Sequence, residues 1–168
     1  VFGVAGFGLG VVFALDPIVA QAVGANDIPA VSRAVQRGLW LALWLAVGTS
    51  IALIPAEPLF RLLGQPAEVV PLAARYVHLS IPGMFPFFGF ITLRQSLQAM
   101  SRMRPIVVTI LLANVLNAAL CWILVFGRFG VPFRGVAGAA VETVLARWAM
   151  TAGLLVLAWP HLKPLLSD

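Results

Sequence analysis

The sequence predicts an all-α protein that crosses a membrane several times, and its composition and patterning support this fold class. Hydrophobic residues make up 61% of the 168 residues and charged residues only 10%, whereas soluble domains carry about a quarter charged residues. The mean hydropathy is +1.01. Apolar runs of about 20 residues, enough to cross a bilayer, recur between short polar segments. We therefore expect a polytopic transmembrane helix bundle of about five spans, at residues 1–24, 38–55, 68–100, 105–126 and 134–159.

The first span begins without an initiator Met, a basic leader or a cleavage site. We expect the chain to be an interior part of a longer protein. Within this span "GFGLG" resembles part of a nucleotide-binding glycine pattern, but no strand precedes it. Gly6 and Gly10 are better interpreted as a small-residue pair for close helix packing.

The end of the first span carries Asp16 and Gln21, and Pro17 disfavours helical backbone at Asp16. A bend with polar side chains suits a hinge used in gating, and an ordinary solvated helix end is the equally weighted alternative. Residues 25–37 are expected to form a polar connection to the second span, which should end near Pro55.

The third span is longer than a bilayer crossing requires. Pro82 and Pro86 each remove a backbone hydrogen bond and should bend it, and Arg94 and Gln95 near its end are expected to have gating or structural roles. The apolar residues beside the prolines face either a substrate cavity or lipid; these are Met84, Phe85, Phe87 and Phe88.

The fourth span should start near Pro105, which suits the first turn of a helix. The fifth should end at about residue 159, because residues 160–168 are polar and broken by proline. Spans alternate in direction, so the loops divide between two sides. The side richer in Arg and Lys is expected to be cytoplasmic; its residues are Arg33, Arg37, Arg94, Arg102, Arg104 and Lys163.

The formal net charge of +5 does not indicate nucleic-acid binding, because the basic residues form no run. The single cysteine cannot form an internal disulfide. No cluster of His, Cys or acidic residues has the spacing of a metal site, so we expect no metal and no cofactor. The sequence shows no nucleophile paired with a general base, as an enzyme of this kind would need, so we expect no catalytic residue.

Asn114, Asn117 and Cys121 share one stripe of the fourth span, the two amides being about 60° apart around the helix. Amides in hydrocarbon need partners, so the stripe should face other helices or a water-filled cavity. Either interhelical hydrogen bonding or a transport site would account for it. Glu142 and Arg147 are ionisable residues within the fifth span. Glu142 is a candidate proton carrier or a solvated helix-end residue. Arg147 points about 140° away from it, so a direct ion pair is not expected.

Several segments resemble the multidrug and toxic compound extrusion family of transporters. "ALDPIVAQAVGAND", "IPGMFPFFGFITLRQSLQAMSRMRP", "NVLNAALCWILVFG" and "GVAGAAVETVLARW" occur in the order of that family's second, fourth, fifth and sixth helices. The resemblance implies part of the amino-terminal lobe of a twelve-helix, two-lobe antiporter, whose first helix and carboxy-terminal lobe lie elsewhere. It also implies export of cationic or amphipathic small molecules, driven by H⁺ or Na⁺, in the inner membrane of a bacterium.

The resemblance assigns Asn117 and Thr143 to the cation-coupling site of the amino-terminal lobe. Cys121 stands where the family often has Asp or Asn, and a thiol neither carries a proton at neutral pH nor suits Na⁺. The alternatives for Thr143 and Asn114 are hydrogen bonds that only hold helices together. The rival functions are a flippase for lipid-linked oligosaccharides of the same superfamily and a structural membrane subunit that transports nothing.

Overall fold

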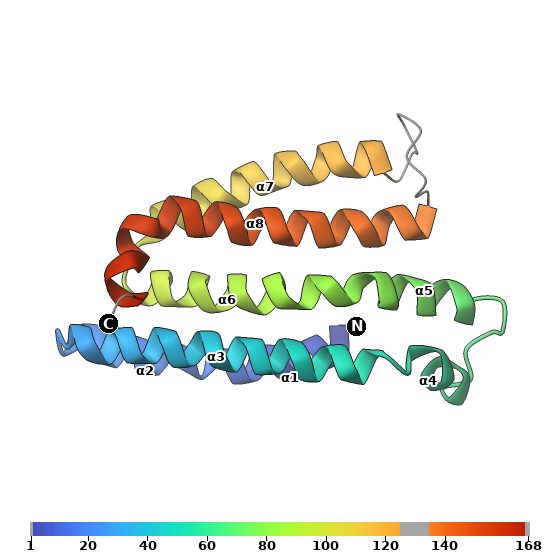
Figure 1. Ribbon diagram of the computed structural model, residues 1–168, viewed down its shortest axis with the longest axis horizontal. Helices are drawn as coiled ribbons and strands as arrows, with labels where there is room; N and C mark the ends of the chain where they lie inside the picture. The colour runs from blue at the N-terminus through green and yellow to red at the C-terminus, as the bar shows by residue number, and fades with distance from the viewer. Residues whose placement is uncertain (1, 125–134, 167–168) are drawn as a thin grey trace.

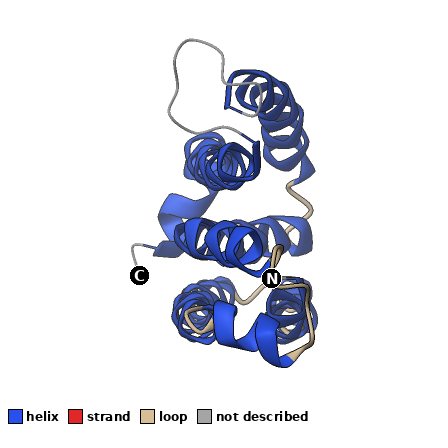
Figure 2. Ribbon diagram, turned by 90° about the vertical axis from the view of Figure 1, so that its right-hand side faces the viewer, coloured by secondary structure: helices blue, strands red, loops and turns tan. Residues whose placement is uncertain are grey.

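The computed structural model describes residues 2–124 and 135–166, and all the elements in these ranges are helices. Residues 125–134, which include the ends of two expected spans and the "GRFGVPFRG" loop, lie outside the described residues. The helices run side by side with alternating direction (Figure 1). Viewed along their axes they form a bundle with α7 at one edge (Figure 2).

The first expected span consists of two helices, α1 (Phe2–Phe13) and α2 (Leu15–Gly24). The break lies at Ala14, and Pro17 is accommodated within the first turn of α2. The backbone therefore bends before Asp16 rather than at it. Of the glycines in α1, Gly8 is the one that packs closely, because a Cβ there would lie 2.6 Å from Phe88, whereas Gly6 and Gly10 are exposed.

Helix α3 (Ile28–Leu53) begins ten residues before the expected second span, so residues 28–37 are helical rather than a polar connection. Asp27 caps the helix by accepting a hydrogen bond from the Ala30 amide at 2.9 Å, and a proline occupies the first turn. A 58° bend separates α3 from the short α4 (Ala56–Leu62).

The third span is one long, interrupted helix: α5 (Val70–Ser80), the 3₁₀ turn η1 (Ile81–Gly83) and α6 (Met84–Ala99). The interruption follows from Pro82, which cannot donate to the carbonyl of His78; the Ile81 amide takes that carbonyl instead, in the tighter 3₁₀ pattern. Met84 and Phe88 are fully buried in the core, so they line neither a cavity nor lipid.

The last two helices are α7 (Met103–Leu124) and α8 (Gly135–Leu166). α7 packs mainly against α8, which also contacts α3, α5 and α6. α8 continues through Pro160 and Pro164 to Leu166, beyond the end expected at residue 159. Hydrogen bonds from α3 stabilise this extension, because the carbonyl of Leu165, at the end of α8, accepts from the side chains of Ser32 (2.6 Å) and Gln36 (3.1 Å).

Three of the described helical segments are long and apolar enough to cross a membrane: Val70–Ala99, Met103–Leu124 and Gly135–Leu165. The bent pair α3–α4 is a fourth if it counts as one span, and Gly8–Gly24 is a shorter apolar helix. The α2–α3 link, the α6–α7 link and the last turns of α8 meet at one end of the bundle (Figure 1). This end is here called the basic end, because these segments and the helix turns next to them carry Arg33, Arg37, Arg102, Arg104 and Lys163.

Candidate functional site: a carboxylate and an amide between α7 and α8

Glu142 is buried between helices although it carries an ionisable carboxyl group. It lies two turns from the start of α8, and only 7% of its surface is exposed. The side-chain amide of Asn117 on α7 donates a hydrogen bond to Glu142 Oε1. An acidic group within a membrane span is costly unless it has a partner, water or a proton. Asn117 supplies that partner from the neighbouring helix.

Thr143 completes the cluster. Its hydroxyl donates to the carbonyl of Ala139, one turn earlier, at 2.9 Å, and lies 3.4 Å from Glu142 Oε2. The short bond is the ordinary bond of a helical threonine to the preceding turn. The longer contact places a second polar group beside the carboxylate.

This arrangement can accommodate either protonation state of the carboxyl group. An asparagine amide offers N–H groups to an ionised carboxylate and a carbonyl oxygen to the O–H of a protonated one. Rotation of the Asn117 amide therefore keeps a hydrogen bond to Glu142 whichever state is present.

Small residues bring the two helices close enough for this contact. Ala146 is buried on α8, on the same face as Glu142, and Ala113 is buried on α7 one turn from Asn117. Further along the same seam lies a cavity of about 200 Å³, partly lined by Thr109 and Gly153. The Thr109 hydroxyl is buried there without a hydrogen-bond partner in the described part of the chain.

The other polar residues of the α7 stripe stay outside the cluster. Asn114 is exposed and has no hydrogen bond to a described residue. Cys121 is half-buried and free. The described helices therefore cover only one side of α7, and of the three stripe residues only Asn117 reaches the carboxylate.

Arg147 lies on a different face of α8 and forms no ion pair with Glu142. Its guanidinium stacks over the ring of Phe87 on α6, 4.7 Å from the ring centroid, and its Nη1 is buried without a partner among the described residues. A Cβ on Gly83 would lie 3.4 Å from Arg147 Cδ, so glycine at the 3₁₀ turn leaves room for this side chain.

The remaining gating or structural candidates lie away from the carboxylate. Gln95 is 4% exposed on α6, and both of its amide atoms lack partners among the described residues. Arg94 is exposed on the same helix. Asp16 is half-buried in the first turn of α2, and Gln21 is exposed.

The hydrogen bond that links α8 to α6 at Pro86 was not predicted from the sequence. The Thr151 hydroxyl donates to the carbonyl of Pro86 at 2.8 Å and also contacts the carbonyl of Arg147 at 3.0 Å. A signal was present, because Thr143, Arg147 and Thr151 recur every four residues and so form one polar stripe on α8.

A sequence model of the family described as MatE matches residues 1–123. This chain belongs to the multidrug and toxic compound extrusion (MATE) family. It is 40% identical over 152 residues to the probable multidrug resistance protein NorM of Rhizobium meliloti (strain 1021), and the match covers 89% of this chain and 32% of that protein. It is 33% identical over 149 residues to the multidrug resistance protein NorM of Vibrio parahaemolyticus serotype O3:K6, covering 89% of this chain and 33% of that protein.

The fold is also that of a MATE transporter. A solved structure described as the inward-facing conformation of a multidrug resistance MATE family transporter of the MOP superfamily superposes with a TM-score of 0.81. The two chains are 25% identical, and the match covers 94% of this chain and 35% of the other. The present chain thus spans about a third of the length of the MATE proteins it matches.

Proposed function

We propose that this chain is part of the amino-terminal lobe of a multidrug exporter, and that Glu142 carries the proton whose inward flow drives export. The part-buried hydrogen bond from Asn117 to the buried carboxyl group of Glu142 is the observation that carries the proposal. NorM relatives are named for multidrug resistance, which supports export of several compounds rather than one metabolite. The proposed substrates are cationic or amphipathic small molecules.

The proposed mechanism is alternating access, in which two lobes rock around a site near the middle of the membrane. Protonation removes the charge of Glu142, so the α7–α8 seam carries a negative charge in one step of the cycle and none in another. In the low dielectric of a membrane, the free-energy difference between a charged and a neutral side chain is several kcal/mol. This is enough to shift the equilibrium between the two states of an alternating-access cycle.

The proposed coupling ion is H⁺ rather than Na⁺. One carboxylate that already accepts an amide N–H needs only a proton to become neutral, whereas a hard metal cation prefers a shell of several oxygen ligands. Near Glu142 the described polar groups are those of Asn117 and Thr143, and the thiol of Cys121 is a poor ligand for a hard cation.

The test is Glu142→Gln in the complete protein, reconstituted into vesicles with a pH gradient and a fluorescent cationic dye. Glutamine keeps the size and a hydrogen-bonding group but cannot take up and release a proton, so pH-driven efflux should fall at least about tenfold. Glu57→Gln is the matched control, because that carboxylate forms an exposed ion pair with Arg61 at 2.6 Å and the charge change is the same.

Unchanged efflux by Glu142→Gln would refute the role of Glu142. Efflux that follows an imposed Na⁺ gradient and ignores the pH gradient would refute the choice of ion. Asn117→Ala separates coupling from helix packing: a coupling role predicts a shifted pH dependence of efflux with normal expression. Unchanged efflux would leave the amide as an interhelical bond only.

A further inference from the structure

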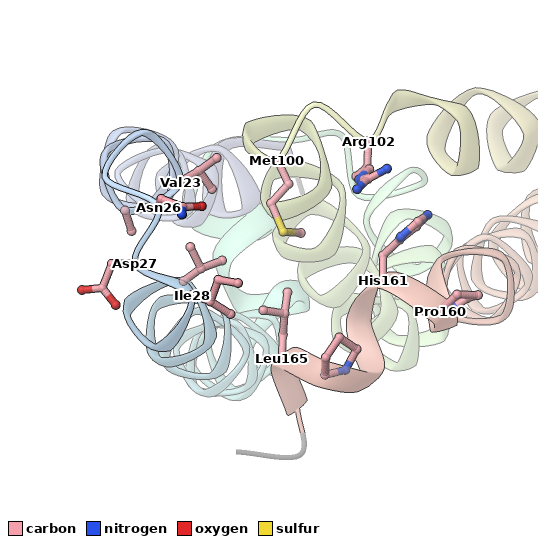
Figure 3. A pocket seen from close by; sticks show the side chains of 12 residues that line it. Val23, Asn26, Asp27, Ile28, Met100, Arg102, Pro160, His161 and Leu165 are labelled. Carbon is pink, nitrogen blue, oxygen red and sulfur yellow. The ribbon is translucent and has the colours of Figure 1, made fainter.

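Another cavity lies at the basic end, far along α8 from Glu142. It has a volume of about 340 Å³, is open on one side, and is lined by the α2–α3 link, the α6–α7 link and the last turns of α8 (Figure 3). This volume is at the lower limit of small-molecule sites. It suits a compact group rather than a drug-sized molecule.

Two tightly closed helix ends form much of its frame. Asn26 after α2 and Ser101 after α6 both adopt left-handed backbone, with φ of 56° and 58°. The residue after each of these makes the 6→1 hydrogen bond of a Schellman motif. The amide of Asp27 donates to the carbonyl of Ala22, and the amide of Arg102 donates to the carbonyl of Leu97 at 2.8 Å. The backbones that carry the lining side chains are therefore set by these turns.

The third wall is the proline-containing end of α8. Pro160 and Pro164 both line the cavity, and the Leu165 carbonyl is held by Ser32 and Gln36 of α3. These bonds attach the last turn of α8 to the start of α3. The cavity thus lies where three structurally tied segments meet.

The charged side chains of the lining are Arg102 and Asp27, which lie on opposite sides of the cavity (Figure 3). Arg102 and His161 lie on the same side, and neither side chain forms a hydrogen bond or an ion pair with a described residue. Asp27 lies on the opposite side, with its carboxylate pointing away from the cavity and bonded to the Ala30 amide. Arg102 therefore offers its positive charge on one side of the cavity, and the carboxylate on the other side is turned away, which favours an anionic ligand over a cationic one.

Apart from Asn26, the rest of the lining is apolar and includes Val23, Val31, Met100 and Leu165. The cavity also lies where the spans Val70–Ala99 and Gly135–Leu165 end, which is the level of the lipid headgroups if these helices cross the bilayer. A ligand that fits must combine an anionic head with an apolar body.

We propose that this cavity binds the phosphate headgroup of an anionic phospholipid. Arg102 supplies a charged fork for the phosphate oxygens, and the His161 ring can donate an N–H in either protonation state. Basic pockets between transmembrane helices on the cytoplasmic side are typical headgroup sites. Free phosphate shares the same head chemistry but would leave the apolar lining uncovered.

The test uses the purified complete protein in a non-ionic detergent, with its melting temperature measured during titration by dioleoyl phosphatidylglycerol. The lipid should raise the melting temperature, and Arg102→Gln should weaken the apparent affinity about tenfold, the usual scale of one charge-assisted contact. Arg104→Gln is the matched control, since Arg104 is exposed like Arg102 and lies two residues away, but does not line the cavity. His161→Gln gives a second, independent variant.

Equal loss of affinity in Arg102→Gln and Arg104→Gln would overturn the proposal, because only a diffuse surface charge would then be at work. Equal stabilisation by dioleoyl phosphatidylcholine would also overturn it. The same shift with inorganic phosphate at equal concentration would overturn the lipid assignment, since a soluble anion would then suffice. The measurement does not depend on transport, so it stands apart from the role of Glu142.

Discussion

Replacement of Arg147 by Met separates a structural anchor from a transport residue. In the structure the guanidinium stacks on Phe87 at 4.7 Å, while its Nη1 is buried without a partner in the described part of the chain. The change removes both features but keeps an unbranched side chain. The two effects on the free energy of unfolding have opposite signs.

The magnitudes indicate which effect is larger. A cation–π contact contributes about 0.5–2 kcal/mol, and a buried donor without a partner costs about 1–3 kcal/mol. Arg147→Met should therefore leave the stability within about 1 kcal/mol of the parent, on the stabilising side. Arg147→Ala also removes two methylene groups, Cγ and Cδ, at about 0.8 kcal/mol each and should destabilise by about 1–2 kcal/mol.

The assay is thermal or detergent unfolding of the complete protein in micelles, followed by tryptophan fluorescence, with dye efflux measured on the same variants. A loss of 2 kcal/mol or more in Arg147→Met would refute the reasoning, because the guanidinium would then make a strong bond in the folded protein. Normal stability with lost efflux would instead show that the charge itself serves transport.

Two further predictions concern helix packing. Gly8→Ala should destabilise the protein by about 1–3 kcal/mol, because the new Cβ would lie 2.6 Å from the fully buried Phe88. Gly10→Ala should be neutral or slightly stabilising, since nothing lies within 4 Å of a Cβ there. Equal unfolding midpoints for the two variants would contradict this packing. Ser32→Ala should cost about 1 kcal/mol by removing the 2.6 Å bond to Leu165, and it should speed proteolysis at the end of α8; an unchanged rate of cleavage would show that this bond does not hold the end of the helix.

The helical class and the presence of long apolar spans follow directly from composition, because a bilayer leaves only fully hydrogen-bonded structures available. The start of α3 was harder to predict. Hydropathy reports which residues suit lipid, and the exposed Arg33 and Arg37 made residues 25–37 resemble a loop. The buried Val31 and Val35 alternate with these arginines at helical spacing, and Asp27 caps the helix before them.

The end of α8 could not be predicted for a different reason. Judged from the neighbouring sequence alone, Pro160 and Pro164 indicate the end of a helix. The hydrogen bonds that stabilise the longer helix come from Ser32 and Gln36, more than a hundred residues earlier in the chain. Such long-range partners leave no periodic signal in the sequence near α8.

The candidate site was predicted only in parts. Resemblance to the family indicated Asn117 and Thr143, and the cost of a charge in lipid indicated Glu142. The contact between Asn117 and Glu142 depends on how α7 and α8 are rotated against each other, which no local sequence pattern reports.

Among the described helices α7 packs mainly against α8, and this has a consequence for biosynthesis. A ribosome completes α7 before α8, so the Asn117 amide leaves the ribosome before the carboxylate that accepts its hydrogen bond has been made. An unpaired amide disfavours partition of a lone helix into lipid. Delivery of α7 and α8 together as a hairpin would bring donor and acceptor into the bilayer in one step.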